Sequence, residues 1–226
     1  MTKKDVIQLL EKNKNARGIA AWGRMGDQSM KSFGMGLTQL RQIAKKIGKD
    51  HALALELWDS DYYEARVMAA LIDDPKHITP KQAEQQLKTA GFWMLAYIYC
   101  ETLALTPFAR EKAEEWVKSK NDLHRRCGYL MLTSLVKNDR SLDDTYLEPY
   151  LDLFEKKLQQ EENFVKDAMN ASLLAIGMRN KKLNKRAVLV AKKIGKVEVD
   201  YGDNSCQAPD CVKHLTNPAL LKRLAS

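Results

Sequence analysis

Apolar residues recur at intervals of three and four along most of the chain, the spacing that places them on one face of an α-helix. This pattern is clearest over residues 37–47, 62–72, 123–136, 164–176 and 183–194. Less regular helical patterns cover residues 3–15, 51–58, 91–105, 107–117 and 141–160. Residues 16–34 contain four glycines and predict helix fragments and loops. The chain is therefore predicted to be all-α.

Capping residues separate the predicted helices. Thr79 is a typical N-cap residue, and Pro80 suits the first helical position because its missing N–H would be unpaired there anyway. Thr106 and Pro107 repeat this pair before another predicted helix. The six prolines fall near predicted junctions or in the C-terminal tail, so none is expected to interrupt a helix. Glycines that follow apolar runs predict helix ends at Gly48, Gly177 and Gly195.

One short segment departs from the helical pattern. Residues 196–201, Lys-Val-Glu-Val-Asp-Tyr, alternate polar and apolar side chains, which is typical of a β-strand. Because the run is short and belongs to the tail, residues 196–226 are predicted to form a C-terminal loop and a short helix.

Several predicted helices begin with a related pattern. Tyr63-Glu-Ala-Arg66, Leu123-His-Arg-Arg126 and Phe164-Val-Lys-Asp167 each place an apolar residue three positions before a charged one, with a weaker equivalent near Trp93. Their separations of about thirty to forty residues are typical of helix-pair repeats of the HEAT or armadillo type. We therefore predict a HEAT-like helical-repeat solenoid, an α-α superhelix, as a single domain over residues 1–226 with its repeat core at 16–195. An irregular helical bundle is the alternative.

The composition is that of a globular protein. Of 226 residues, 45% are hydrophobic and 29% are charged, which is enough to bury a core, so the chain is not expected to be disordered. No apolar window is long enough to span a membrane, and the N-terminal segment lacks the apolar core of a secretory signal. Four cysteines in a chain of this length do not make a disulfide framework, which predicts the reducing environment of a cytoplasmic protein.

Positive charge is concentrated between residues 123 and 196. The net charge is +8 and the pI is about 9.2. A local surplus of this kind indicates a polyanionic partner, most often nucleic acid. Arginine side chains and free backbone N–H groups at helix N-termini both attract phosphate, so the repeats are predicted to line one surface with positive charge. Two alternatives stay open: the lysines of residues 181–196 form an ordinary solvated face, and the arginines pair with nearby carboxylates.

Four aromatic residues share one predicted helix: Phe92, Trp93, Tyr97 and Tyr99. They form either a stacking surface for a nucleobase or part of the core.

Metal and cofactor motifs are weak or absent in the sequence. Cys206, Cys211 and His214 lack the second ligand pair that a zinc site needs, so no metal is predicted. There is no P-loop, nucleophile elbow or paired-histidine motif, so no cofactor is expected either.

Several segments resemble the AlkD-like DNA alkylation repair proteins. They are ELWDSDYYEARVMAALIDDP at 56–75, TPFA at 106–109 with KAEEW at 112–116, NFVKDAMN at 163–170 with IGMRN at 176–180, and GDNSC at 202–206. This resemblance implies a HEAT-like solenoid with a basic concave face that holds duplex DNA. It also implies, for active members, release of positively charged alkylated purines without metal or nucleotide, where cleft aromatics and a carboxylate stabilise an oxocarbenium-like sugar.

The cleft residues implied by this resemblance are only partly present. Trp93 matches the first cleft tryptophan, and Arg126 matches the cleft arginine. Tyr97 occupies the position of the catalytic aspartate, and Ala171 that of the second cleft tryptophan. A tyrosine hydroxyl, neutral near pH 7, cannot supply the charge of a carboxylate. Glu101, the only acid between residues 91 and 105, lies one helical turn beyond Tyr97.

We therefore predict a DNA-binding member of this family whose base-excision activity is weak or lost. One alternative is an active alkylpurine DNA glycosylase that uses a displaced acid such as Glu101, and a second is a protein-interaction solenoid. The expected partner is duplex DNA, intact or damaged, bound by a monomer. The predicted DNA-binding residues are Arg66, Trp93, Arg125, Arg126, Lys166, Lys182, Lys185 and Arg186.

Overall fold

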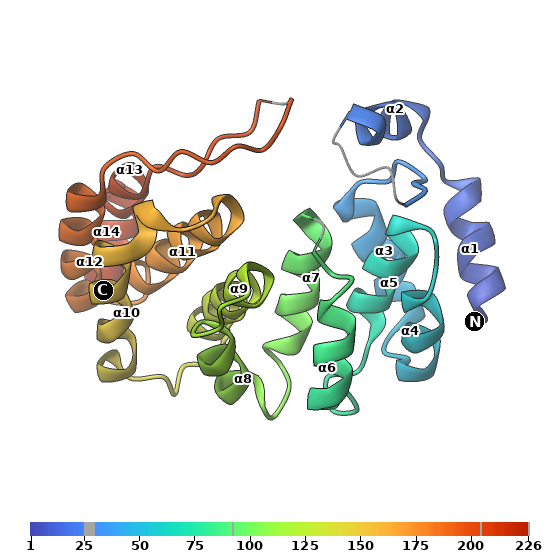
Figure 1. Cartoon of the computed structure of the whole chain (residues 1–226), viewed down its shortest axis with the longest axis horizontal. Helices are drawn as coiled ribbons and strands as arrows, with labels where there is room; N and C mark the ends of the chain where they lie inside the picture. The colour runs from blue at the N-terminus through green and yellow to red at the C-terminus, as the bar shows by residue number, and fades with distance from the viewer. Residues whose placement is uncertain (25–29, 92, 204, 226) are drawn as a thin grey trace. The chain divides into compact units, whose positions relative to one another are not determined.

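The computed structural model describes residues 1–24, 30–91, 93–203 and 205–225 (Figure 1). These residues form fourteen α-helices and one 3-10 helix, with no β-strand beyond an isolated bridge between Lys31 and Tyr62. The all-α prediction is therefore confirmed. None of these helices is long and apolar enough to cross a lipid bilayer. The helices group into two units, residues 1–108 and 109–226, and the single-domain organisation stays a prediction.

The first unit is built on a succession of packed helices. α3, α5 and α7 pack one against the next, α4 packs against α5, and α1 contacts both α4 and α5. Side chains such as Leu40, Leu57, Met68 and Leu95 are fully buried between them. The described helices of this unit are α1 (Lys3–Lys12), α2 (Ala16–Arg24), α3 (Leu37–Ile47), α4 (His51–Trp58), α5 (Tyr63–Ile72), α6 (Pro80–Leu87) and α7 (Trp93–Leu103).

A buried carboxylate fastens the segment before α3 to α5. Glu64, 1% exposed, accepts hydrogen bonds from Ser32 Oγ at 2.7 Å, from the Phe33 N–H at 2.9 Å and from the Met35 N–H at 3.1 Å. Three donors satisfy the charge that burial would otherwise penalise. The segment turns at Gly34, whose φ of 69° favours glycine.

The second unit repeats the alternation of packed helices. α9 and α11 lie side by side, α8 packs on α9, and α12 contacts both α10 and α11. Its described helices are α8 (Ala109–Trp116), α9 (Asp122–Asn138), α10 (Asp144–Lys157), the 3-10 helix η1 (Leu158–Gln160), α11 (Asn163–Gly177), α12 (Lys181–Ile194), α13 (Cys211–Leu215) and α14 (Pro218–Ala225).

Small residues and buried hydroxyls set the close approach of the helices around α9. A Cβ at Gly128 would lie 2.6 Å from the main-chain nitrogen of Val117, so the contact between α8 and α9 requires glycine. Ser172 Oγ on α11 donates to the Tyr129 carbonyl on α9 at 2.8 Å and lies 2.9 Å from Thr133 Oγ1. These polar groups are therefore satisfied inside the helix pair.

Helix boundaries follow the predicted caps at some positions. Thr79 caps α6 through the Gln82 N–H at 3.1 Å, with Pro80 at the first position, and Gly48 and Gly195 end α3 and α12 with positive φ. Gly177 is instead the last residue of α11. There a Cβ would lie 2.6 Å from a methyl group of Leu215, so this glycine serves packing rather than termination.

Two predictions about prolines are wrong. Thr106 and Pro107 do not open a helix, because α8 begins at Ala109 and Thr106 Oγ1 donates to the Leu103 carbonyl at the end of α7. Pro149 lies inside α10, which continues through it at an exposed position. Proline has no N–H, so the carbonyl four residues before it lacks its usual helical donor, and water can take that place at the exposed surface.

The C-terminal tail differs most from its prediction. The strand-like run at residues 196–201 forms no strand in the described part of the chain. Residues 195–203 instead extend away from α12, and residues 205–210 return to α13, as two arms (Figure 1). Two short helices, α13 and α14, follow where one was expected.

Candidate nucleic-acid interface

The positions predicted to match the family cleft belong to both units. Tyr97 and the backbone of Trp93 belong to α7 in the first unit, whereas Arg126 on α9 and Ala171 on α11 belong to the second. Phe92 and the side chain of Trp93 lie outside the described residues.

Tyr97 lies near an ion pair between Glu101 and Arg41 in the first unit. Arg41 Nη2 on α3 lies 2.7 Å from Glu101 Oε2 on α7, and Glu101 lies one helical turn beyond Tyr97. Burial, and then the negative charge of Glu101, raise the pKa of Tyr97 above its usual value. The phenol is therefore neutral at pH 7, and the nearby carboxylate is already paired with a cation.

Tyr99 belongs to the core rather than to a stacking surface. It is 1% exposed, its ring centroid lies 4.8 Å from that of Trp58, and its hydroxyl donates to the Ala83 carbonyl at 3.3 Å. For this residue the core alternative is confirmed.

Arg126 is held by packing near the start of α9. It is 5% exposed, and its guanidinium carbon lies 4.7 Å from the ring centroid of Phe164 on α11, a cation–π contact between the two helices. Phe164 is itself 36% exposed, and Ala171, further along α11, is half-buried. The arginine thus lies beneath a ring that forms part of the surface.

Arg125, the neighbouring residue, forms a network at the same end of α9. Its Nη2 lies 2.8 Å from Glu161 Oε2 and 2.7 Å from Asp122 Oδ1, and Nη1 donates to the carbonyls of Ser119 and Lys120. The side chain is 17% exposed. A phosphate at this position would have to compete with two carboxylates, so Arg125 is chiefly a structural residue.

Lys166 lies in the first turn of α11. The N-cap residue Glu162 makes no side-chain capping hydrogen bond, and the first turn contains no acidic residue. Lys166 is half-buried. This helix end therefore combines free backbone N–H groups with a cation, the arrangement that attracts anions.

Helix α12 has two rows of cations, one paired with carboxylates and one exposed to solvent. The first row faces α10 and forms ion pairs: Lys182 with Glu148 at 2.7 Å, Arg186 with Asp152 at 2.6 Å and with Glu155 at 3.2 Å, and Lys193 with Glu155 at 2.6 Å. The second row, Lys181, Lys185 and Lys192, is exposed and forms no ion pair with any described residue. The second row is therefore the better candidate for phosphate contact.

Two other arginines are committed to backbone carbonyls. Arg66 Nε on α5 donates to the Ser60 carbonyl at 2.9 Å. The guanidinium of Arg179 donates to four carbonyls, those of Val136, Asp139, Arg140 and Leu142. Arg179 therefore closes the C-terminal end of α9.

Sequence reasoning missed two contributors to these clusters. Phe164 served only as a repeat marker, and its contact with Arg126, 38 residues earlier, leaves no local pattern in the sequence. Arg41 gave no signal at all, because its partner Glu101 is 60 residues away in the chain.

The cysteine and histidine residues of the tail do not gather. No group of three or more His, Cys, Asp or Glu side chains in the described part of the chain is arranged to hold a metal ion. Cys211 is buried, and its thiol donates to Asn170 Oδ1 at 2.8 Å. Burial raises the pKa of this thiol to about 12, so it is not a reactive group.

Known proteins resemble this chain over most of its length. Two curated relatives, the uncharacterized proteins Lin0241 of Listeria innocua and Lmo0209 of Listeria monocytogenes, are each 26% identical over 191 residues, covering 83% of both chains. A solved structure from a new family of proteins related to the HEAT-like repeat DNA glycosylases with affinity for branched DNA structures is 26% identical. Its TM-score is 0.87, and the match covers 99% of this chain and 96% of that one.

The likeness to that structure confirms the predicted HEAT-like repeat fold. The family profile described as DNA alkylation repair enzyme matches residues 6–199, which confirms the AlkD-like resemblance. The chain therefore belongs to the DNA alkylation repair enzyme family.

Proposed function

We propose that this protein binds DNA, branched DNA included, and that its base-excision activity is weak or lost. The observation that carries the proposal is its likeness, over nearly the whole chain, to a protein with affinity for branched DNA structures. The exposed lysine row of α12 and the cation at the start of α11 supply positive charge of the kind that phosphate backbones attract. The basic concave face and the monomeric state belong to the same proposal.

The loss of excision is supported by the cleft positions. Breaking the glycosidic bond of an alkylated purine leaves positive charge on the sugar, which a nearby carboxylate stabilises. Tyr97 is neutral at the aspartate position, and Ala171 offers no aromatic face at the tryptophan position. The chain thus offers cations that can bind phosphate, but Tyr97 offers no negative charge, and Ala171 no aromatic face, to stabilise a sugar cation.

One observation favours an active glycosylase as the second candidate. Glu101 lies one turn from Tyr97, and its charge acts on the Tyr97 phenol, so a shift of the Arg41 side chain would leave a carboxylate close to the family position. In that case Glu101 would stabilise the sugar cation in place of the missing aspartate.

Binding is tested first by fluorescence anisotropy with a four-way junction and a linear duplex of the same length. We expect the junction to bind more tightly, and affinity for both to fall linearly with the logarithm of the salt concentration. No binding to either DNA at low salt would reject the proposal and leave the protein-interaction solenoid.

Excision is tested by release of free base from a duplex that contains 7-methylguanine. We expect no release by the wild type, and partial recovery in Tyr97→Asp but not in the matched Tyr97→Asn, because only the aspartate restores negative charge. Release by the wild type that disappears in Glu101→Gln would establish the second candidate instead.

A further inference from the structure

Phe164, the second residue of α11, presents an aromatic ring at the surface of the second unit. Its exposed fraction is 36%, and among the exposed large apolar side chains of the described residues it alone is aromatic. No other aromatic ring in the described part of the chain packs against it. A ring that the fold leaves at the surface without an aromatic neighbour is a candidate for contact with a ligand.

One face of this ring lies on a buried cation. The guanidinium carbon of Arg126, which is 5% exposed, is 4.7 Å from the ring centroid of Phe164. Movement of the ring would break this cation–π contact, so the ring is held in place. The cation also draws π electrons away from the other face, which lowers the repulsion that the π electrons of a second stacked ring would meet there. The free face is therefore preorganised for stacking.

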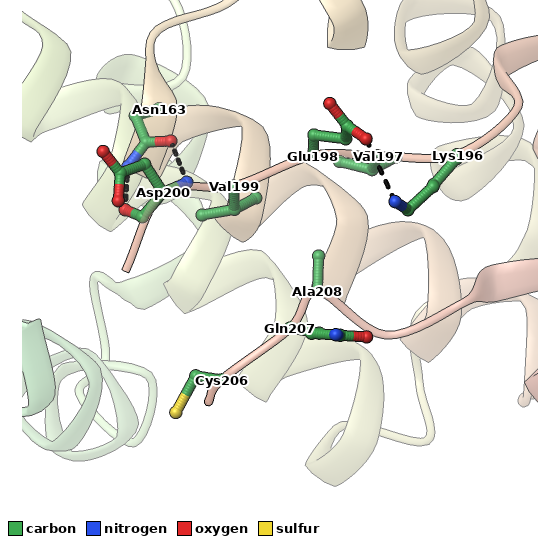
Figure 2. Close-up of a pocket in the computed structure, with 9 residues that line it drawn as sticks. All are labelled: Asn163, Lys196, Val197, Glu198, Val199, Asp200, Cys206, Gln207 and Ala208. Atoms are coloured by element: carbon green, nitrogen blue, oxygen red, sulfur yellow. Dashed lines mark hydrogen bonds and ion pairs between the residues drawn. The ribbon is translucent and has the colours of Figure 1, made fainter. Parts of the chain in front are cut away.

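The extended arm that follows α12 is fixed to the same end of α11 but does not cover the ring. Asn163, which precedes Phe164, donates to the Asp200 carbonyl at 2.6 Å and accepts from the Asp200 N–H at 2.8 Å (Figure 2). One turn along α11, the Tyr201 hydroxyl donates to Asp167 Oδ1 at 2.7 Å. Asn163 also lines an open cavity of about 480 Å³ between the two arms of the tail. The arm therefore borders the ring and leaves it open to solvent.

The charges around the ring have both signs. The cations are Arg125, Arg126, Lys166 and Lys196, and the acids are Glu161, Glu162, Asp167, Glu198 and Asp200. Several of them are already engaged: Arg125 pairs with Glu161 at 2.8 Å, and Lys196 pairs with Glu198 at 3.0 Å. Charge by itself therefore does not identify the ligand of this surface, and the aromatic ring is the more specific signal.

A nucleobase suits this surface better than an apolar segment of a protein does. The core of a protein interface needs a contiguous apolar patch, but the exposed and half-buried residues beside Phe164 on the first turns of α11 are all polar. They are Glu162, Asn163, Lys166 and Asp167. A base needs only one flat apolar face to stack on, and its polar edges tolerate polar neighbours and water.

We propose that Phe164 is a stacking platform for an unpaired nucleobase next to the branch of a DNA, and that this contact makes branched DNA bind more tightly than linear duplex. The inference rests on the proposed binding of branched DNA and names the part of that DNA which the ring recognises.

Branch points supply the bases that such a platform requires. In a linear duplex every base is paired and stacked, and swinging one out costs both interactions. A base next to a branch, or in a single-stranded arm, has already lost part of them. The ring therefore adds affinity for branched DNA and none for linear duplex, and it does so without preference for a sequence because every base has a face to stack.

Two substitutions at the ring test the proposal by fluorescence anisotropy. Phe164→Leu removes the aromatic face but keeps an apolar side chain, so it should weaken binding to a splayed fork by about tenfold and binding to a linear duplex by less than about twofold. Phe164→Tyr, which keeps the ring, should bind both DNAs as the wild type does. A purely structural role of the ring over Arg126 would weaken both DNAs alike and would overturn the proposal, as would no loss on the fork.

Removal of the base tests the same contact from the side of the DNA. A fork whose unpaired nucleotides nearest the branch are abasic should bind the wild type about tenfold more weakly than the intact fork does. Phe164→Leu should bind the two forks equally, because the two changes remove one and the same interaction. Equal weakening for both proteins would mean that the bases contact another part of the chain, and the proposal would be wrong.

Photocrosslinking locates the contact in the wild-type chain and does not depend on the folding of a variant. A 5-iodouracil placed at the unpaired position next to the branch should attach to Phe164 on irradiation, which mass spectrometry of the digested protein detects. Attachment only to other residues would overturn the proposal. Absence of wild-type binding to either DNA would reject the proposed DNA binding itself, whereas fork binding that Phe164→Leu leaves unchanged would reject only the role of the ring.

Discussion

The C-terminal end of α9 and the outer side of α12 both depend on cations from the same basic stretch, yet the two regions use them in different ways. At α9, Arg179 donates to four backbone carbonyls and holds the chain between Val136 and Leu142. On α12, Lys181, Lys185 and Lys192 project from the helix without an ion pair to any described residue. Charge density in the sequence therefore overstates the charge that is available to a ligand.

The difference has a simple physical origin. A guanidinium placed opposite unpaired carbonyls makes several charge-assisted hydrogen bonds at once, and removing it leaves those acceptors unsatisfied. A lysine that faces water makes no such bonds within the protein, and when it meets a phosphate it releases counterions from the nucleic acid without leaving a protein acceptor unsatisfied. The first kind of cation should affect stability, and the second kind should affect binding.

Substitution of Arg179 gives the largest expected effect. Arg179→Met keeps most of the side-chain length but removes the hydrogen bonds to four carbonyls, so the free energy of unfolding should fall by about 3 kcal/mol. Urea denaturation measured by circular dichroism checks this value. The exposed neighbour Arg140 provides the control, since Arg140→Met should change the free energy by less than about 0.5 kcal/mol. An equally small change for Arg179→Met would contradict the claim that Arg179 stabilises the fold.

The exposed row of α12 gives the next largest effect, and it concerns binding. Replacing Lys181, Lys185 and Lys192 by glutamine should weaken DNA binding by about tenfold or more at low salt, while the free energy of unfolding stays close to wild type. If all three contact phosphates, the slope of log affinity against log salt should decrease by up to about 3. Anisotropy titrations over a series of salt concentrations measure both quantities.

The paired row supplies the matched control for that triple variant. Replacing Lys182, Arg186 and Lys193 by glutamine removes the same number of positive charges from the same helix but leaves the acids of α10 unpaired. We expect a smaller change in salt slope than for the exposed row. Equal slopes for the two triple variants would show that the ion pairs with α10 do not make these cations less available to phosphate, and the distinction between the two rows would be wrong.

The smallest expected effect is on stability and involves a single ion pair of the paired row. Arg186 lies 2.6 Å from Asp152 Oδ1, but its side chain is 38% exposed, and exposed pairs contribute little. Arg186→Gln should therefore lower the free energy of unfolding by less than about 1 kcal/mol, and the loss should shrink at high salt. A loss as large as that of Arg179→Met would place Arg186 among the cations that hold the fold.

Local sequence determined much of the helical structure. Three-four periodicity identified α3, α5, α9, α11 and α12 because each buries one face against neighbours. Thr79 capped α6 as expected because that interaction lies within one turn. Thr106 failed as a cap because its hydroxyl bonds backward to Leu103, a choice between two local partners that its sequence does not settle.

The candidate site depended more on tertiary structure. Motif resemblance predicted Tyr97, Arg126 and Ala171 as cleft positions, but it did not reveal that Arg41 pairs with Glu101 or that the Phe164 ring covers Arg126. These partners are far apart in the chain, so no local pattern records them.

Helix α12 shows most directly which properties the sequence predicts and which depend on the tertiary structure. Its amphipathic pattern and its surplus of lysine and arginine are properties of the sequence, and they were sufficient to predict a basic helix. Lys181 and Lys182 are neighbours in the chain, and so are Lys185 and Arg186, but one residue along a helix is a rotation of about 100°. The packing of α10 against α12 decides which of them meets a carboxylate and which stays in water. The sequence thus set the charge of the helix, and the tertiary structure decided which cations a ligand can reach.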